Sequence, residues 1–233
     1  PIVFTPMGSD IILHSQEKKF YQHMAKAAFN KASIITGDSL LLQRKGYLVG
    51  ASKKRNYIIQ NGVDSNIFYP KSNQLKKKYT VPDDTTLIFS PRAITPIYNI
   101  DVIIYSLGEL KSTGYNFKCM FSFAFGDEYS KQLCIQSQKS GLENNIIWLG
   151  SLTYQEMAEH YNAADIVLSV PSSDSSPKSV YEAMFCGKPV IVTDLEWTNE
   201  LLSEHNCLLK VPVRDSKRLT ESIVSIIKNS VIR

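Results

Sequence analysis

Long apolar runs are missing from this sequence: none approaches the roughly 18 residues that a membrane-spanning helix needs. Cysteine is scarce, and the four present show neither CxxC pairs nor the spacing of a zinc site (Cys119, Cys134, Cys186, Cys207). We therefore expect reduced, mostly buried thiols and a cytoplasmic protein. The chain also lacks a P-loop, an HxE…CxxC set, a Ser/His/Asp order for acyl transfer and a basic-aromatic pattern for nucleic acid.

The composition is that of an ordinary soluble globular protein, with 233 residues, 43% hydrophobic and 21% charged. The net charge of +4 is carried partly by two basic clusters, Lys53–Arg55 and Lys76–Lys78. Such clusters are most often solvated surface, and the functional alternative is attraction to an anionic lipid or nucleic acid.

The most informative stretch is Pro171–Pro189, whose pattern predicts a loop, a short helix and a turn between two buried strands. Ser176 is a good N-cap, Pro177 suits the first helical position, and Gly187 followed by Pro189 ends the helix. On this helix Val180, Ala183 and Met184 share one face, which we expect to pack on the sheet. Lys178 and Glu182 share another, which we expect to face a ligand.

The start of this helix is a candidate anion site. The amides of Ser176, Lys178 and Ser179 point out of the helix, where its dipole favours a phosphate. Asp174 lies eight positions before Glu182, so two carboxylates would bracket the phosphate and accept hydrogen bonds from sugar hydroxyls. From these residues alone, a helix with a purely structural role remains an alternative, because any parallel α/β domain has Ser-capped helices with an acidic residue on the solvent side.

The spacing Asp174-x7-Glu182, with the block Ala183–Asp194 after it, resembles the Glu-x7-Glu and E-A-M-x-x-G-x-P-V-I signature of the glycosyl transferases group 1 family. One position departs from the signature, because Asp174 stands where the family has Glu. The resemblance implies a retaining, metal-independent enzyme that uses a nucleoside-diphosphate sugar. It also implies the GT-B fold, in which two Rossmann-like domains face a cleft.

Further passages resemble the same family. Asn61–Pro70 resembles N-G-V-D-x-x-x-F-x-P, the passage between the two domains, and Pro91–Asp101 resembles G-R-x-x-x-x-x-K-G-x-D. Arg92 matches the Arg that contacts the donor diphosphate, whereas Tyr98 replaces the Lys. Gly126 and Gly150 follow two further strands, near the expected nucleotide. Gly8 ends the first strand, where Met7 replaces a His-containing turn of many relatives, so no catalytic histidine is carried over.

The periodicity predicts β-α-β-α-β pieces over Pro1–Asp64, beginning with a buried strand at Pro1–Pro6 and a helix at Gln16–Ala32 with Phe20, Met24, Ala27 and Ala28 inward. A polar linker is expected at residues 65–84 and a doubly wound parallel sheet at residues 85–233. The expected strands are Leu87–Ser90, Lys118–Phe125, Ile146–Leu149, Ile166–Val170, Val190–Thr193 and Cys207–Val211. The expected helices are Asn99–Ser112, Tyr129–Ser140, Tyr154–Ala163, Ser176–Phe185, Asn199–His205 and Ser216–Asn229.

The resemblance implies transfer of a hexose-type sugar from a UDP-, GDP- or ADP-sugar to a sugar or lipid-linked acceptor, in polysaccharide or glycolipid synthesis. Arg92, the segment Ser176, Pro177, Lys178, Ser179 and the phenol of Tyr98 would contact the phosphates, Glu182 the ribose and Asp174 the sugar. No metal, cofactor or nucleic acid is expected. Association of the protein with the inner face of the membrane remains an alternative. Because part of the first domain and the family's last segment are expected to be missing, we expect this stretch alone to be inactive. A non-catalytic nucleotide-sugar-binding module and an epimerase of the same fold remain alternatives.

Overall fold

The computed structural model describes residues 1–15, 18–122, 127–201 and 208–229, which form two compact units. The first unit consists of residues 1–62, 173–178 and 195–204, and the second of residues 63–172, 179–194 and 205–233. Each unit contains its own parallel sheet. The boundaries expected at residues 64 and 84 stay predictions.

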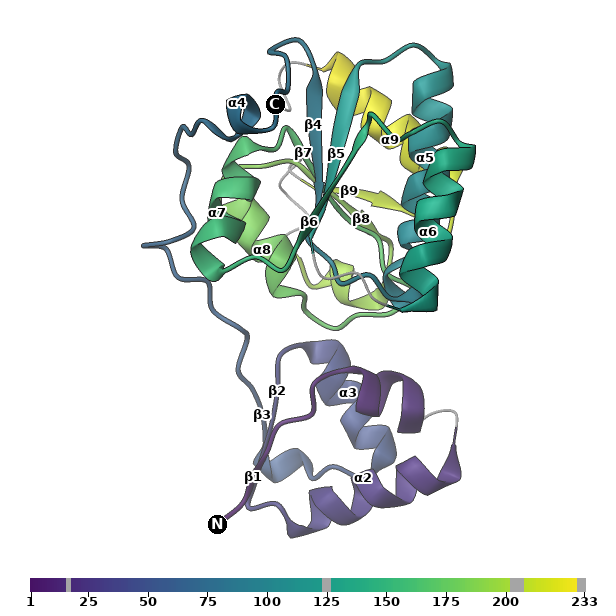
Figure 1. Ribbon diagram of the computed structural model, residues 1–233. Helices are drawn as coiled ribbons and strands as arrows, with labels where there is room; N and C mark the ends of the chain where they lie inside the picture. The colour runs from purple at the N-terminus through teal and green to yellow at the C-terminus, as the bar shows by residue number, and fades with distance from the viewer. Residues whose placement is uncertain (16–17, 123–126, 202–207, 230–233) are drawn as a thin grey trace. The chain divides into compact units, whose positions relative to one another are not determined.

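The first unit is built on a three-stranded parallel sheet in the order β1-β2-β3 (Figure 1). Its core consists of apolar side chains from the sheet and the helices beside it, among them Ile11, Phe29, Ile35, Leu42 and Val49. In chain order the elements are β1 (Val3–Phe4), the π-helical turn η1 (Asp10–His14), α2 (Lys19–Lys31), β2 (Ile34–Gly37), α3 (Leu40–Val49), the 3₁₀ turn η2 (Lys53–Arg55) and β3 (Asn56–Ile58).

The second unit is a six-stranded parallel sheet in the order β6-β5-β4-β7-β8-β9. The strands are β4 (Thr86–Ser90), β5 (Phe117–Ser122), β6 (Ile146–Gly150), β7 (Ile166–Ser169), β8 (Val190–Thr193) and β9 (Leu208–Val211). The helices and 3₁₀ turns are α4 (Leu75–Lys78), η3 (Pro96–Tyr98), α5 (Ile100–Ser112), α6 (Glu128–Lys139), α7 (Tyr154–Ala163), α8 (Lys178–Phe185) and α9 (Ser216–Lys228). The 3₁₀ turn η4 (Glu196–Asn199) belongs to the first unit.

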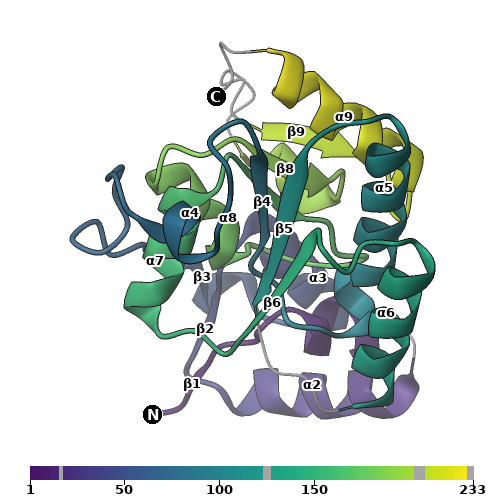
Figure 2. The same cartoon turned by 45° about the horizontal axis from the view of Figure 1, so that its top comes forward.

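Helices cover both faces of this sheet. Figures 1 and 2 show α5, α6 and α9 on one side and α7 and α8 on the other. The central strands are short runs of apolar residues buried throughout, as expected of a sheet covered on both faces. The strand order reverses between β4 and β7. In doubly wound sheets ligands bind at this switch point, beyond the carboxyl ends of the strands.

The segment between β3 and β4 is attached to α7, and we call residues 68–76 the α7 strap. Phe68 is fully buried and meets the rings of Tyr154 and Tyr161 edge-on. The Asn162 side chain accepts a hydrogen bond from the Lys71 amide (2.8 Å) and donates one to the Tyr69 carbonyl (3.1 Å). The Nζ of Lys76 lies 2.8 Å from Asp165 Oδ2. Other contacts along the strap include the hydrogen bond from the Asn73 side chain to the Glu159 carbonyl.

The expected α/β fold with parallel sheets is confirmed, and the strands of the second unit lie within about one residue of their predicted bounds, apart from the end of β5. β5 is described up to Ser122, and residues 123–125 of the strand expected at Lys118–Phe125 lie outside the described residues. Helix α8 begins at Lys178, one residue later than a Ser176 cap implies. The helix expected at Asn199–His205 and the start of the strand at Cys207–Val211 lie mostly or partly outside the described residues.

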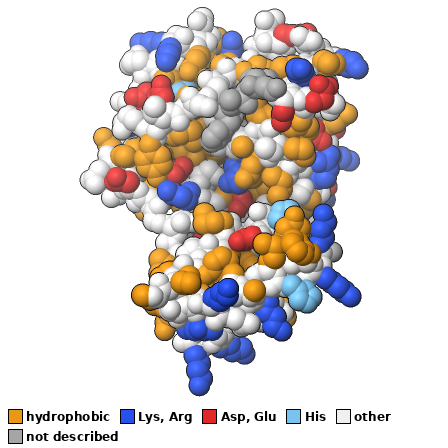
Figure 3. Space-filling model, turned by 60° about the horizontal axis from the view of Figure 1, so that its bottom comes forward, with side chains coloured by type: hydrophobic (Ala, Val, Ile, Leu, Met, Phe, Trp, Pro, Cys, Tyr) orange, Lys and Arg blue, Asp and Glu red, His pale blue; other side chains and the backbone are white. Residues whose placement is uncertain are grey.

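Two predictions about burial in the first unit are wrong. Val3 in β1 is 61% exposed, although a buried strand was expected. In α2 the inward residues are Ala25 and Phe29, whereas Phe20 is 69% and Met24 54% exposed; Ala27 is exposed and Ala28 half-buried. The helix has apolar residues on more than one face, and the core of this unit covers only the face of Ala25 and Phe29. Figure 3 shows apolar side chains in orange interspersed with Lys and Arg side chains in blue on the surface.

Candidate functional site

Arg92 lies at the switch point of the second unit, two residues after β4 ends. Its guanidinium carbon is 4.2 Å from the centre of the Tyr98 ring, and its Nη1 donates a hydrogen bond to Ser179 Oγ at 2.9 Å. Ser179 stands in the first turn of α8, which follows β7. The topology therefore brings Arg92 into direct contact with two other predicted residues, Tyr98 and Ser179.

Glu182 lies one turn further along α8 and is only 6% exposed. Its Oε2 accepts a hydrogen bond from the hydroxyl of Tyr161 on α7, at 3.0 Å. Burial raises the pKa of Tyr161 well above its usual value, and the negative charge of Glu182 adds to the shift. Tyr161 therefore stays protonated at physiological pH and serves as a permanent donor to this carboxylate.

Glu182 is buried although it lies on a different face of α8 from Val180 and Ala183, which are buried as well. That the Glu182 face meets a ligand stays a prediction. Helix α8 is covered on the Glu182 side as well, because α7 brings Tyr161 against it. A buried carboxylate is stable only with hydrogen-bond donors around it, so the Tyr161 pairing explains how the acid is held there.

The residue after Tyr98 links three loops at the carboxyl edge of the sheet. Asn99 is fully buried with φ of 54°, in the left-handed region, where the family pattern has Gly. Its amide nitrogen donates to the Val170 carbonyl and to Ser172 Oγ, both at 2.9 Å, and its Oδ1 accepts from Arg214 Nη1 at 2.9 Å. These bonds connect the loops that follow β4, β7 and β9.

The predicted residues Asp174, Ser176, Pro177 and Gly8 belong to the first unit. Asp174 Oδ1 accepts the amide hydrogen of Ser175 at 2.9 Å, while Ser176 and Pro177 are buried. Gly8 has φ of +113°, and a Cβ at this position would approach Ser175 Oγ to 3.3 Å. Both the backbone conformation and the space therefore favour glycine at position 8. Lys178 is grouped with the same unit and is exposed at the first position of α8.

A carboxylate that was not predicted lies next to this segment. Asp38 Oδ2 accepts a hydrogen bond from Ser175 Oγ at 3.0 Å, directly after β2. Burial raises the pKa of Asp38 above its usual value, although the hydrogen bond from Ser175 opposes the shift. Its position at the carboxyl end of a strand and before the Ser39 N-cap was a usable signal in the sequence. Tyr161 had no such signal, because its partner lies 21 residues away.

Gly150 and Gly126 are the glycines predicted to lie near the nucleotide. Gly150 ends β6 with φ of +72°, a conformation that favours glycine, and no atom lies within 4 Å of a Cβ built there on the described structure. Gly126 lies outside the described residues. Trp148, two residues before Gly150, stacks on Phe121 with ring centres 4.9 Å apart and packs against the main core.

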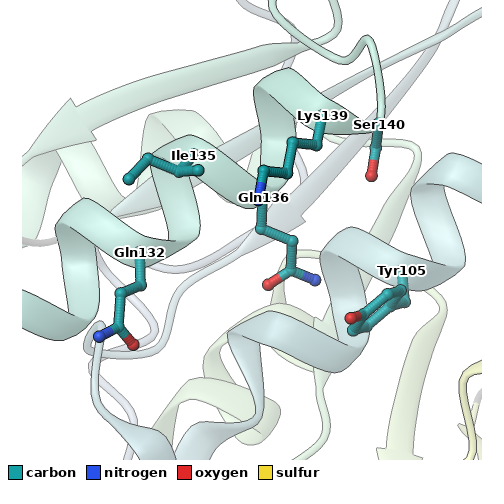
Figure 4. Close-up of a pocket in the computed structure, with 6 residues that line it drawn as sticks. All are labelled: Tyr105, Gln132, Ile135, Gln136, Lys139 and Ser140. Carbon is teal, nitrogen blue, oxygen red and sulfur yellow. The ribbon is translucent and has the colours of Figure 1, made fainter.

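A groove of about 350 Å³ lies between α5 and α6 (Figure 4), and its lining residues include none of those predicted for the site (Tyr105, Gln132, Ile135, Gln136, Lys139, Ser140). Among the described residues, no three or more His, Cys, Asp or Glu side chains are grouped so that they could hold a metal ion. Within the same ranges, every helix is too short or too polar to cross a membrane.

Known proteins with similar sequences are glycosyltransferases. The chain is 24% identical over 132 residues to an alpha-monoglucosyldiacylglycerol synthase of Streptococcus pneumoniae, covering 56% of this chain and 29% of that protein. It is 29% identical over 100 residues to a phosphatidyl-myo-inositol mannosyltransferase of Mycobacterium leprae, covering 42% of this chain and 27% of that protein.

The fold matches solved structures of the same class. The crystal structure of Anabaena HepE in complex with UDP and glucose superimposes with a TM-score of 0.87 at 21% identity, covering 100% of this chain and 63% of that one. In each of the three comparisons the match spans less than two thirds of the relative's own length. The expected GT-B type of fold is thereby confirmed. Because the profile of the family described as "Glycosyl transferases group 1" matches residues 71–233, this chain belongs to the glycosyl transferases group 1 family.

Proposed function

We propose that the protein transfers a hexose-type sugar from a nucleoside-diphosphate sugar to an acceptor, with retention of configuration and without a metal ion. The observation that carries the proposal is the cluster at the switch point of the second unit. There Arg92 contacts Ser179 in the first turn of α8, and Glu182 lies buried one turn later. A guanidinium and a carboxylate at this edge suit an anion joined to a polyhydroxylated ring.

Each predicted residue has a proposed role in this chemistry. The reaction creates negative charge on the leaving diphosphate, which the Arg92 guanidinium would stabilise. The amides of Ser176, Lys178 and Ser179, together with the Lys178 ammonium, would contribute in the same way. Pro177 restricts the backbone conformation at the helix start but has no N–H group to donate. Glu182 would accept hydrogen bonds from the ribose hydroxyls, and Asp174 from the sugar.

The donor proposed first is a UDP-sugar, because HepE was solved with UDP and glucose and matches the whole length of this chain. Gly150 would let the nucleotide approach the backbone closely, and the same role is proposed for Gly126. Gly8 would line the acceptor side. These assignments rest on the family resemblance and on the positions of the residues at strand ends.

A lipid-linked acceptor at a membrane surface is proposed on two grounds. The relatives from S. pneumoniae and M. leprae bear the names of enzymes acting on diacylglycerol and phosphatidylinositol derivatives. In addition, α2 exposes Phe20 and Met24, begins beside Lys18 and Lys19, and contains no Asp or Glu. A helix with exposed apolar residues and basic neighbours suits the interface of an anionic bilayer.

Calorimetric titration with UDP, GDP and ADP tests the donor site. We expect one diphosphate to bind, and Glu182→Gln to weaken it by about 1–3 kcal/mol, or roughly 5- to 150-fold, through loss of charge-assisted hydrogen bonds. Glu221→Gln on α9 is the matched control, since it removes an equally charged but exposed side chain that pairs with Arg218. Unchanged affinity in a folded Glu182→Gln variant would contradict the assignment. For the full-length enzyme, proton NMR of the anomeric product tests retention.

A further inference from the structure

The chain differs from its family at the residue that would supply a second positive charge beside Arg92. The family pattern has Lys where Tyr98 stands, as the last residue of η3. Tyr98 is half-buried and packs against the main core, and its amide donates to the Thr95 carbonyl at 3.0 Å. A short turn packed on the core therefore holds its ring in place.

The guanidinium of Arg92 lies over the face of the Tyr98 ring. The 4.2 Å from the Arg92 Cζ to the ring centre is well within the roughly 6 Å over which a cation is attracted to an aromatic face. Ser179 fixes the same guanidinium from a different element, through the 2.9 Å hydrogen bond to Nη1. Two contacts from η3 and α8 thus constrain the end of a side chain that otherwise has many rotamers.

We propose that Tyr98 is a positioning residue, which holds the Arg92 guanidinium through the face of its ring in the orientation that receives the diphosphate of the donor. The inference rests on the proposed function, and in it the Tyr98 ring takes the place of the second cation in the family pattern. A guanidinium held in advance loses less conformational freedom when the anion binds, so part of the affinity lost with the Lys is regained through preorganisation.

Two other roles for Tyr98 make different predictions. If its hydroxyl contacted the phosphate directly, Tyr98→Phe would weaken binding as much as Tyr98→Leu. If the side chain only filled space in the core, Tyr98→Leu would change stability and leave the affinity of the folded protein unchanged. The ring-face role requires that Phe preserve the affinity and that Leu reduce it.

The test is calorimetric titration of this 233-residue chain and its variants with the diphosphate that binds the unmodified protein, taken from UDP, GDP and ADP. We expect Tyr98→Phe to bind as the unmodified chain does, and Tyr98→Leu to bind about 2- to 30-fold more weakly, the usual range for a cation–aromatic contact. In the background of Arg92→Gln, Tyr98→Leu should cause no further loss, because its effect passes through Arg92.

A second measurement needs no ligand. Nitrogen relaxation of the Arg92 side-chain Nε–H should show a more mobile guanidinium in Tyr98→Leu than in the unmodified chain and in Tyr98→Phe. Equal affinity and equal Arg92 mobility in the Leu variant would overturn the inference, as would a Phe variant as weak as Leu. If no diphosphate binds the unmodified chain, the proposed function fails, whereas the relaxation measurement still judges whether Tyr98 orders Arg92.

Discussion

Replacing Asn99 should separate the cost of its backbone conformation from the value of its side-chain hydrogen bonds. Asn99 is fully buried at φ of 54° and ψ of 40°, and it holds the loops after β4, β7 and β9 together. Asn99→Ala removes the bonds to the Val170 carbonyl and to Arg214, and it places an alanine in the left-handed region. Asn99→Gly removes the same bonds without the conformational cost.

The magnitudes follow from these contacts. A buried group that loses its hydrogen-bond partner costs about 1–3 kcal/mol, and the buried Val170 carbonyl is such a group. The left-handed conformation costs an ordinary residue about 1–2 kcal/mol, and Asn tolerates it better than Ala does. We therefore expect Asn99→Ala to lose about 3–4 kcal/mol of unfolding free energy and Asn99→Gly about 1 kcal/mol less than that.

Chemical denaturation of the three proteins measures this difference. Circular dichroism follows the unfolding and checks that each variant folds. The reasoning predicts the stability order Asn, then Gly, then Ala. An alanine variant as stable as the unmodified chain, or more stable than the glycine variant, would refute it.

Three further predictions concern other parts of the chain. Burial lowers the pKa of His160 below its usual 6.5, so on acidification the unfolded state binds a proton at a higher pH than the folded state does. The unfolding free energy should therefore fall as the pH drops from 7.5 to 5, and His160→Gln should flatten this pH dependence. Burial raises the pKa of the Cys186 thiol to about 11 and that of Cys119 further, so peptide mapping should find both alkylated by iodoacetamide at pH 8 only after denaturation; rapid labelling of the native protein would contradict their burial. The double variant Phe20→Ser, Met24→Ser should sediment less with vesicles of anionic lipid while its midpoint of unfolding stays nearly unchanged, and equal sedimentation would remove α2 from the proposed membrane contact.

The second unit could be predicted closely from the sequence because its signals are local. Val190–Thr193 is a short β-branched run between turn residues, and such a run can be read without knowing its neighbours. The position of Arg92 at a strand end follows from the rules of doubly wound sheets, whereas the order of the strands was not predicted, because those rules allow more than one order. The candidate site was therefore located largely from pattern and resemblance.

The remaining features depend on contacts between distant residues. The sequence pattern of α2 shows where its apolar residues lie, but it does not indicate which of them the core covers. Phe20 was therefore predicted to point inward, although it is exposed. The contact between Glu182 and Tyr161 was not predicted, because nothing near Glu182 in the sequence indicates that Tyr161 lies against it. The stacking of Arg92 on Tyr98 was not predicted, since the spacing suggested only a hydroxyl in place of an ammonium.

The α7 strap has a practical consequence for dissecting the protein. Its composition is that of a polar connection, so a truncation that starts at residue 85 would look safe from the sequence. Such a truncation would remove Phe68 and so uncover Tyr161, the residue that donates to Glu182. A failure of the shortened protein to bind nucleotide would then reflect the loss of the Phe68 ring. It would not test the residues that contact the ligand.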